Sequence, residues 1–469
     1  MATGLGMFVP AILASRDDLH AMARMFFYIG ILTLILTVFI AIATRHQTRH
    51  QSSLGHLFSL VCAFLLLPAV QAAPAARLLP DLSLLDAYLD FIACFTTTGI
   101  ALHADPATYA VPLQFWRAEV AWLGGLLVWI AALAMLSPFN TTRTAPTAPK
   151  VKTSDSGPLR KALQVAVPIY TGTTAILWLF LIILGNAPLA AAMLAMATLA
   201  TSGITLPGTT PAPFSEAGML LFLALAYSRV WLTARRRALS PQHLVRDPEL
   251  KLTVLLLAVA LAAILSHDWQ TLVKGYNTGQ LTPLLDTVWG ILFTTASHLA
   301  TAGMTSAHWP DTTGLGLNEL VLILLTIIGG GAATTAGGIK LLRVTLLYQS
   351  CHAEVDRMLY PSLVVPSTMQ ADSTLPVRIR EAWLFILLFL FAVAMLQLIM
   401  TALGVDFTTA FVLVVSALST NGPLVETVLG INDLLSTLSP AVKITYAAGM
   451  ITGRIELILI VYLIGQFFR

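Results

Sequence analysis

The sequence predicts an all-α polytopic membrane protein made of four similar repeats, each with two membrane spans on either side of a short helix and a loop. Three observations support this fold class. Hydrophobic residues make up 57% of the 469 residues and charged residues only 10%, whereas about a quarter of the residues in a soluble domain are charged. Apolar segments of spanning length recur along the chain. One short motif recurs four times between them.

Nine segments are long enough to cross a bilayer as helices, which takes about 20 predominantly apolar residues. They lie at 25–43, 56–73, 113–136, 163–184, 215–233, 250–266, 317–348, 380–403 and 441–467. Residues 4–14 are apolar but too short to span, so we expect an interfacial or partial helix there. One span therefore precedes the four repeats.

Four shorter apolar stretches separate pairs of spans, at 84–95, 187–200, 284–300 and 406–418. Runs of this length fit re-entrant half-helices better than spans. Each is followed by a T-x-G sequence: Thr97-Thr98-Gly99, Thr201-Ser202-Gly203, Thr301-Ala302-Gly303 and Thr420-Asn421-Gly422. The four glycines are 104, 100 and 119 residues apart, and a motif at nearly constant spacing indicates repeated structural units.

Basic residues indicate how the chain crosses the membrane. They gather after alternate spans, at Arg45 and Arg49; Arg143, Lys150, Lys152, Arg160 and Lys161; Arg235, Arg236, Arg237 and Arg246; and Lys340, Arg343, Arg357, Arg378 and Arg380. The opposite loops hold few, chiefly Arg77 and Lys274. Because cytoplasmic loops are enriched in Lys and Arg, the four T-x-G loops are expected to open from the outer face.

These features divide the chain. An N-terminal membrane segment (1–50) is followed by repeat 1 (51–140) and a cytoplasmic linker (141–162) rich in Thr, Ser, Pro and Lys. Repeat 2 covers 163–240, repeat 3 covers 241–360 and repeat 4 covers 361–469.

The T-x-G loops have the composition of an ion-selectivity filter. Irregular backbone at membrane depth is tolerated only where it is buried in protein or lines water. There, backbone carbonyls can replace the hydration shell of an ion, as they do in potassium channels. The predicted filter consists of Thr96, Thr97, Thr98, Gly99, Ala200, Thr201, Ser202, Gly203, Ala300, Thr301, Ala302, Gly303, Ser419, Thr420, Asn421 and Gly422. The ion is expected at Thr97, Thr98, Thr201, Ser202, Thr301, Ala302, Thr420 and Asn421.

The charges around the four filter stretches indicate which kind of ion can pass. Each short helix directs its partially negative C-terminal end at the loop, which favours a cation. The four filter stretches contain no Lys or Arg and no acidic ring, so they favour a monovalent cation over an anion or a divalent ion. Asp86, Asp286 and Asp406 lie near helix starts and are expected to act as N-caps. His298 is expected to be a packed or hydrogen-bonded side chain and not a proton carrier.

A glycine-rich stretch, GGGAATTAGGIK (329–340), interrupts the seventh span. It lacks the residue order of a nucleotide-binding loop. A broken helix that exposes backbone to the conduction path is the favoured interpretation, with close helix packing as the alternative. The predicted gate consists of Gly329, Gly330, Gly331, Thr334, Thr335, Gly337, Gly338 and Arg454.

Arg454 belongs to this gate because it lies in the middle of the last span, where an unpaired Arg costs about 2.5–3.5 kcal/mol. Lys443 can reach the outer surface, whereas Arg454 cannot do so easily. Glu456 does not face Arg454, since side chains two apart on a helix diverge. We therefore expect Arg454 to contact the glycine-rich stretch; an Arg satisfied between helices is the alternative.

Four segments together resemble a known family. They are FTTTG (95–99), FWRAEVAWLGG (115–125), GGGAATTAGGIKLLR (329–343) and GRIEL (453–457). Residues 56–469 resemble the Trk/Ktr/HKT superfamily of potassium transporters, and within it the bacterial TrkH-type subunits, which usually have two spans before the repeats. The resemblance implies four covalently linked, potassium-channel-like M1–P–M2 repeats around one pore, with K⁺ as the transported ion. It further implies a homodimer in the bacterial cytoplasmic (inner) membrane and a cytosolic nucleotide-binding regulatory subunit of the TrkA/KtrA type.

Channel-like potassium translocation is therefore the predicted function, with a cation-coupled symporter (K⁺/H⁺ or K⁺/Na⁺) as the alternative. A symporter should show a relay of intramembrane carboxylates or His, and the spans offer few such groups, chiefly Glu119 and Glu456. A membrane enzyme would need a motif such as H-x-x-x-H or G-x-S-x-G, and the sequence contains neither at membrane depth. We expect no organic cofactor, and a net charge of +3 gives no indication of nucleic-acid binding.

Overall fold

The computed structural model describes residues 1–45, 53–79, 82–101, 109–134, 158–208, 211–212, 214–228, 247–267, 282–310, 316–360, 375–430 and 434–455. All regular secondary structure in these ranges is helical, so the all-α prediction is confirmed. Six of the described helices are long and apolar enough to cross a membrane. They are α3 (His20–Thr44), α4 (Ser53–Leu78), α6 (Val111–Ala134), α7 (Pro158–Ile183), α12 (Pro248–His267) and α18 (Leu375–Ala402).

Three of the nine expected spans are not single long helices within the described residues. The seventh is split into α15 (Leu317–Ile328) and α16 (Leu341–Leu359) by the glycine-rich stretch 329–340, where the sequence predicted a break. The last is α22 (Pro440–Ile455), and residues 456–467, including Glu456, lie outside the described residues.

The fifth expected span, 215–233, is wrong as a single helix. Helix α9 (Ser215–Leu223) tightens into the 3₁₀ turn η2 (Ala224–Ala226), and residues 229–233 lie outside the described residues. The carbonyl of Ala226 accepts hydrogen bonds from the Gly331 amide (2.8 Å) and the Thr334 hydroxyl (3.1 Å). These donors come from the third repeat, so nothing in the local sequence predicts the break.

The four half-helices form within two residues of the predicted stretches. They are α5 (Leu84–Phe95), α8 (Pro188–Ala200), α14 (Thr282–Leu299) and α19 (Phe407–Leu418). Asp406 caps α19 as predicted, because its carboxylate accepts from the amides of Thr408 (3.1 Å) and Thr409 (3.5 Å). The cap of α5 is Ser83, whose hydroxyl accepts from the Asp86 amide at 3.0 Å. Asp286 lies inside α14 and does not cap it.

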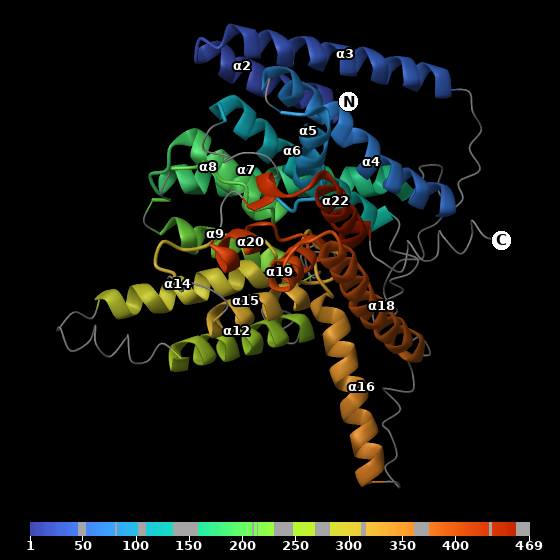
Figure 1. Ribbon diagram of the computed structural model, residues 1–469, viewed down its shortest axis with the longest axis vertical. Helices are drawn as coiled ribbons and strands as arrows, with labels where there is room; N and C mark the ends of the chain where they lie inside the picture. Colours follow the sequence, from blue (N-terminus) through green and yellow to red (C-terminus); the bar gives the residue numbers. More distant parts are fainter. Residues whose placement is uncertain are drawn as a thin grey trace.

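Ahead of the repeats, α1 (Ala2–Gly6) and α2 (Phe8–Arg16) pack against α3 as a helical hairpin. Figure 1 shows α2 running alongside α3 at one end of the molecule. A methyl group on Gly30 would lie 3.2 Å from the carbonyl oxygen of Gly4, so two small residues allow this close approach. The partial helix expected at 4–14 is therefore present, but it is packed against another helix.

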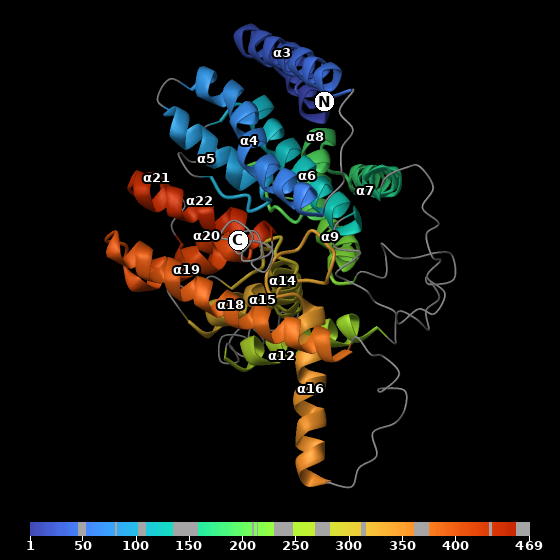
Figure 2. The same ribbon diagram turned by 90° about the vertical axis from the view of Figure 1, so that its right-hand side faces the viewer.

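Contacts among the repeats close a ring in chain order. In each repeat a helix C-terminal to the T-x-G loop packs against the half-helix of the next repeat: α6 against α8, α9 against α14, α15 against α19, and α22 against α5. In the fourth repeat the short helices α20 (Pro423–Leu429) and α21 (Leu434–Thr437) come between the loop and α22. Four M1–P–M2 repeats around one axis would give this arrangement. Helix α16 extends away from the rest of the molecule in both views (Figure 1 and Figure 2).

Candidate functional site

The four T-x-G loops share an unusual backbone conformation. Thr97, Thr201, Thr301 and Thr420 have φ values of 60°, 52°, 55° and 51°. This left-handed region is uncommon for residues other than glycine, especially β-branched ones. Such strain persists only where the surrounding structure imposes it, and it concentrates at functional sites. The same conformation at four equivalent positions indicates that the loops serve one common structure.

The loops meet as a closed ring, which we call the filter ring (residues 96–99, 200–203, 300–303 and 419–422). A methyl group added to Gly99 would lie 1.7 Å from the Ser202 carbonyl oxygen, and one on Gly203 would lie 2.4 Å from that of Ala302. At Gly422 the nearest atom is the Thr98 carbonyl oxygen, at 2.5 Å. At Gly303 it is the side-chain Oδ1 of Asn421, at 2.3 Å. Each glycine thus lies against the middle residue of the next loop.

Buried oxygen atoms without hydrogen-bond partners concentrate in the filter ring. Among the described residues, they include Oγ1 of Thr97 and Thr420, Oγ of Ser202 and Ser419, and Oδ1 of Asn421. An unsatisfied buried polar atom costs about 1–3 kcal/mol, so a cluster of them requires an explanation. A desolvated cation bound among these oxygens would satisfy them. The sixteen filter residues contain no charged side chain, which suits a monovalent ion.

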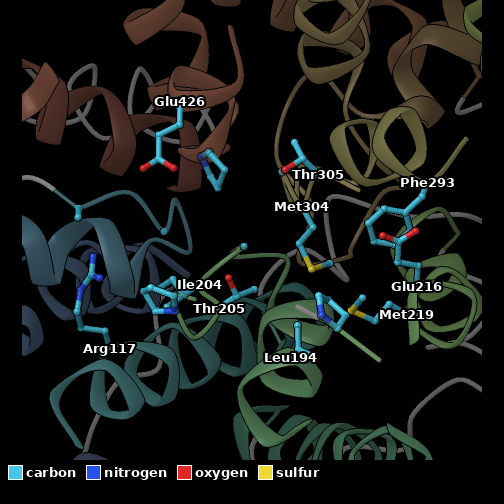
Figure 3. A pocket seen from close by; sticks show the side chains of 17 residues that line it. Arg117, Leu194, Ile204, Thr205, Glu216, Met219, Phe293, Met304, Thr305 and Glu426 are labelled. Atoms are coloured by element: carbon cyan, nitrogen blue, oxygen red, sulfur yellow. The ribbon is translucent and has the colours of Figure 1, made fainter. Parts of the chain in front are cut away.

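A cavity of about 380 Å³ adjoins the glycine end of the filter ring. Gly99, Gly203 and Gly303 line its base, and Figure 3 shows Glu216 and Glu426 contributed by different repeats. Of the described residues that line it, only Arg117 is basic. Arg117 is paired with Asp90 through two hydrogen bonds of 3.0 and 3.1 Å. We call this space the outer cavity, because the predicted topology places the glycine end outside.

Two ion pairs, one buried and one partly buried, hold α5 in position, and the sequence predicted neither. Arg117 of α6 pairs with Asp90 and also donates to the Ile100 carbonyl at 3.3 Å. Lys443 of α22 pairs with Asp86 at 2.9 Å, and its side chain is only 6% exposed. The expectation that Lys443 reaches the outer surface is therefore wrong, because α22 packs directly on α5. Both ion pairs could have been predicted from the rule that a basic side chain within the membrane needs an acidic partner.

At the threonine end of the filter ring lies the glycine-rich stretch 329–340, which we call the intramembrane loop. The Gly337 amide donates to the Thr301 hydroxyl at 2.7 Å. A methyl group on Gly337 would lie 2.0 Å from the Ser419 carbonyl oxygen. The Thr335 hydroxyl donates to the Leu199 carbonyl at 3.1 Å. The loop therefore contacts three of the four repeats directly at this end of the filter ring.

Arg454 contacts the intramembrane loop, as the sequence led us to expect. Its Nη1 donates to the carbonyl of Thr335, while Nε and Nη2 are buried without a partner among the described residues. Gly337, Gly338 and Lys340 line the same cavity as Arg454. A buried guanidinium with two uncommitted nitrogens thus lies beside the loop, and its role stays a prediction.

The family assignment follows from a match that spans nearly the whole chain. Residues 23–464 match the TrkH family, described as cation transport proteins. The chain belongs to the TrkH family. The resemblance drawn from the four sequence segments is therefore confirmed, and the chain is a multi-pass membrane protein.

Relatives agree with this assignment. The TrkH-family chain is 26% identical, over 87% of its length and 81% of the relative's, to the Trk system potassium uptake protein TrkI of Halomonas elongata. It is 27% identical to the Trk system potassium uptake protein TrkH of Escherichia coli K12, over 80% and 78% of the two chains. The crystal structure of the potassium transporter TrkH from Vibrio parahaemolyticus has the same fold, with a TM-score of 0.79. That match covers 98% of this chain and 95% of the other at 21% identity.

Proposed function

We propose that this chain conducts potassium ions across the cytoplasmic membrane through the filter ring. The closed ring of four T-x-G loops, with its unpartnered buried oxygens, carries this proposal. Relatives that are named potassium uptake proteins support the identity of the ion. An ion entering the outer cavity exchanges its water shell for the oxygens of the ring. The C-terminal ends of α5, α8, α14 and α19 add favourable potential for a cation.

The intramembrane loop and Arg454 form the gate in this proposal. The loop lies against the threonine end of the filter ring through Gly337, and the Arg454 guanidinium holds it through Thr335. A positive charge beside the pathway repels a permeant cation, and the loop backbone obstructs it sterically. Withdrawal of the loop would remove the steric barrier, and displacement of the Arg454 side chain from the pathway would remove the electrostatic one.

A homodimer and a cytosolic nucleotide-binding subunit of the TrkA/KtrA type complete the proposal. The candidate contacts are Arg235, Arg236 and Arg237 and the basic linker 150–161. All of them except residues 158–161 lie outside the described residues. Neutralising the three arginines should weaken co-purification of such a subunit. If no nucleotide-binding protein binds the wild type under any nucleotide condition, the partner proposal fails.

The second candidate function is cation-coupled symport, and the observation that favours it is the buried carboxylate of Glu119. Its Oε2 is buried without a partner among the described residues, as a proton-binding carboxylate would be. The same side chain, however, lies against Gly6 of the N-terminal hairpin, where a methyl group would approach Oε1 to 2.4 Å. That placement is outside the filter ring, so the geometry favours a channel. Uptake that follows an imposed pH gradient and loses this dependence in Glu119→Gln would favour the symporter.

The decisive experiment is cation flux through the purified full-length chain in liposomes. We expect uptake of Rb⁺, a tracer for K⁺, to exceed Na⁺ uptake. Gly172→Ala provides a control for the glycine variants of the filter ring, because nothing lies within 4 Å of the methyl group added at Gly172. Its Rb⁺ and Na⁺ fluxes should match those of the wild type. Equal Rb⁺ and Na⁺ fluxes would contradict potassium selectivity, and fluxes no higher than in protein-free liposomes would contradict conduction.

A further inference from the structure

The filter ring is not fourfold symmetric at the position of Asn421. Three of its glycines lie against a backbone carbonyl oxygen of the next loop, those of Ser202, Ala302 and Thr98. The fourth, Gly303, lies against a side-chain oxygen, Oδ1 of Asn421. An amide side chain therefore occupies the place that the main chain fills in the other three repeats.

The backbone of the fourth loop departs from the others at the same point. Gly99, Gly203 and Gly303 have φ values of 82°, 65° and 68°, whereas Gly422 has a φ of −65°. The Gly422 amide donates to the Thr98 carbonyl at 2.8 Å. The fourth loop thus turns differently after Asn421, and its backbone does not repeat the geometry of the other three.

Two neighbours fix the orientation of the Asn421 amide. Its Nδ2 donates to the Oγ1 of Thr326 (3.0 Å) and to the Nδ1 of His298 (3.1 Å). Thr326 in turn donates to the His298 carbonyl at 3.4 Å. All three residues are fully buried. With both Nδ2 hydrogens committed to these acceptors, Oδ1 has to point in the opposite direction, toward Gly303.

The chemistry of that oxygen matches the site. A side-chain amide oxygen has nearly the same dipole and lone pairs as a peptide carbonyl. Oδ1 is buried and accepts no hydrogen bond from the described residues. No other middle residue of a T-x-G sequence, namely Thr98, Ser202 or Ala302, carries an amide side chain.

We propose that the Asn421 side-chain oxygen is the fourth oxygen of a cation site in the filter ring, and that His298 and Thr326 are its positioning residues. The proposal rests on the filter function proposed above. It assigns His298, expected from the sequence to be a packed or hydrogen-bonded side chain, a part in ion selection. It also makes repeat 4 chemically distinct from the other three within one pore.

The test compares the Rb⁺-to-Na⁺ flux ratio of full-length variants in liposomes. His298→Leu and Thr326→Val each remove one acceptor while keeping the side-chain volume similar. Each should lower the ratio roughly two- to tenfold, the range expected for the loss of one hydrogen bond. His298→Asn, which retains an acceptor near the Nδ1 position, and Thr326→Ser should stay within about twofold of wild type. Asn421→Leu, which removes the oxygen, should lower the ratio at least as much.

A control separates positioning from general stability. Ser416→Ala removes the buried hydrogen bond of 2.6 Å between Ser416 and Tyr446, one turn before the fourth loop. It should lower the melting temperature without changing the flux ratio. An unchanged ratio in Asn421→Leu, His298→Leu and Thr326→Val, with wild type still selective, would overturn this inference alone. An equal loss of selectivity in Ser416→Ala would also overturn it. A wild-type chain without any flux would instead refute the filter function itself.

Discussion

Adding one methyl group at Gly337 tests the proposed gate directly. In the structure that methyl would lie 2.0 Å from the Ser419 carbonyl oxygen and 2.6 Å from Thr420 Oγ1. Gly337 is not among the glycines with positive φ, so Ala adds a contact without backbone strain. Overpacking of this kind costs about 1–3 kcal/mol. The cost falls on the loop in its docked position, since withdrawal of the loop relieves the contact.

The expected result is a higher resting flux. Each 1.4 kcal/mol changes a population ratio about tenfold, so Gly337→Ala should shift the closed-to-open ratio by about 5- to 150-fold. The assay is Rb⁺ flux from liposomes that contain the purified chain without a regulatory subunit. Arg454→Ala, which removes the contact to Thr335, and deletion within 331–336 should raise the flux in the same direction.

The control for this experiment is Gly172→Ala in α7. Nothing lies within 4 Å of the methyl group added there, so resting flux should match wild type. The gate is refuted if Gly337→Ala, Arg454→Ala and the loop deletion all leave the resting flux unchanged in folded protein.

Three further predictions concern the filter ring and its surroundings. Gly99→Ser and Gly422→Ser should lower the Rb⁺-to-Na⁺ flux ratio at near-normal expression, because the Cβ atoms would lie 1.7 and 2.5 Å from neighbouring carbonyl oxygens in the ring; unchanged ratios in variants of all four ring glycines would contradict the filter. Arg117→Met should destabilise the protein by about 3–5 kcal/mol, because it leaves the Asp90 carboxylate buried without its cation. Thermal unfolding should show that the double variant Arg117→Met with Asp90→Leu is more stable than Arg117→Met alone. Glu426→Gln should raise the K⁺ concentration for half-maximal uptake at low ionic strength only, because it removes a negative charge from the outer cavity whose attraction salt screens; an equal effect in high salt would refute the electrostatic explanation.

Local sequence features predicted most of the fold. The half-helices could be located because a run of 12 or 13 apolar residues, such as 84–95 or 188–200, is too short to span and ends in a small polar loop. The broken seventh span was equally visible, since 329–340 contains five glycines. In both cases the signal lies within the segment itself. Segment length then suffices to predict a half-helix, and backbone flexibility suffices to predict a break in a span.

Features that depend on contacts between repeats escaped prediction. No glycine or proline marks the end of α9 at Leu223. The helix ends there because the Ala226 carbonyl accepts a hydrogen bond from the intramembrane loop. Lys443 was expected at the surface because its partner, Asp86, is more than 350 residues away in the sequence. The orientation of the Asn421 amide likewise depends on Thr326 and His298, which belong to another repeat.

Covalent linkage of the repeats would explain how one pore could hold the single gate proposed above. The intramembrane loop already contacts the third loop through Thr301, the fourth through Ser419 and the second half-helix through Leu199. Four copies of such a loop, as a symmetric tetramer would supply, would compete for the same space below one ring. In a single chain, one repeat can carry the loop, another the Arg454 that holds it, and a third the Ala226 carbonyl that anchors it. The asymmetry of the filter ring at Asn421 is possible for the same reason.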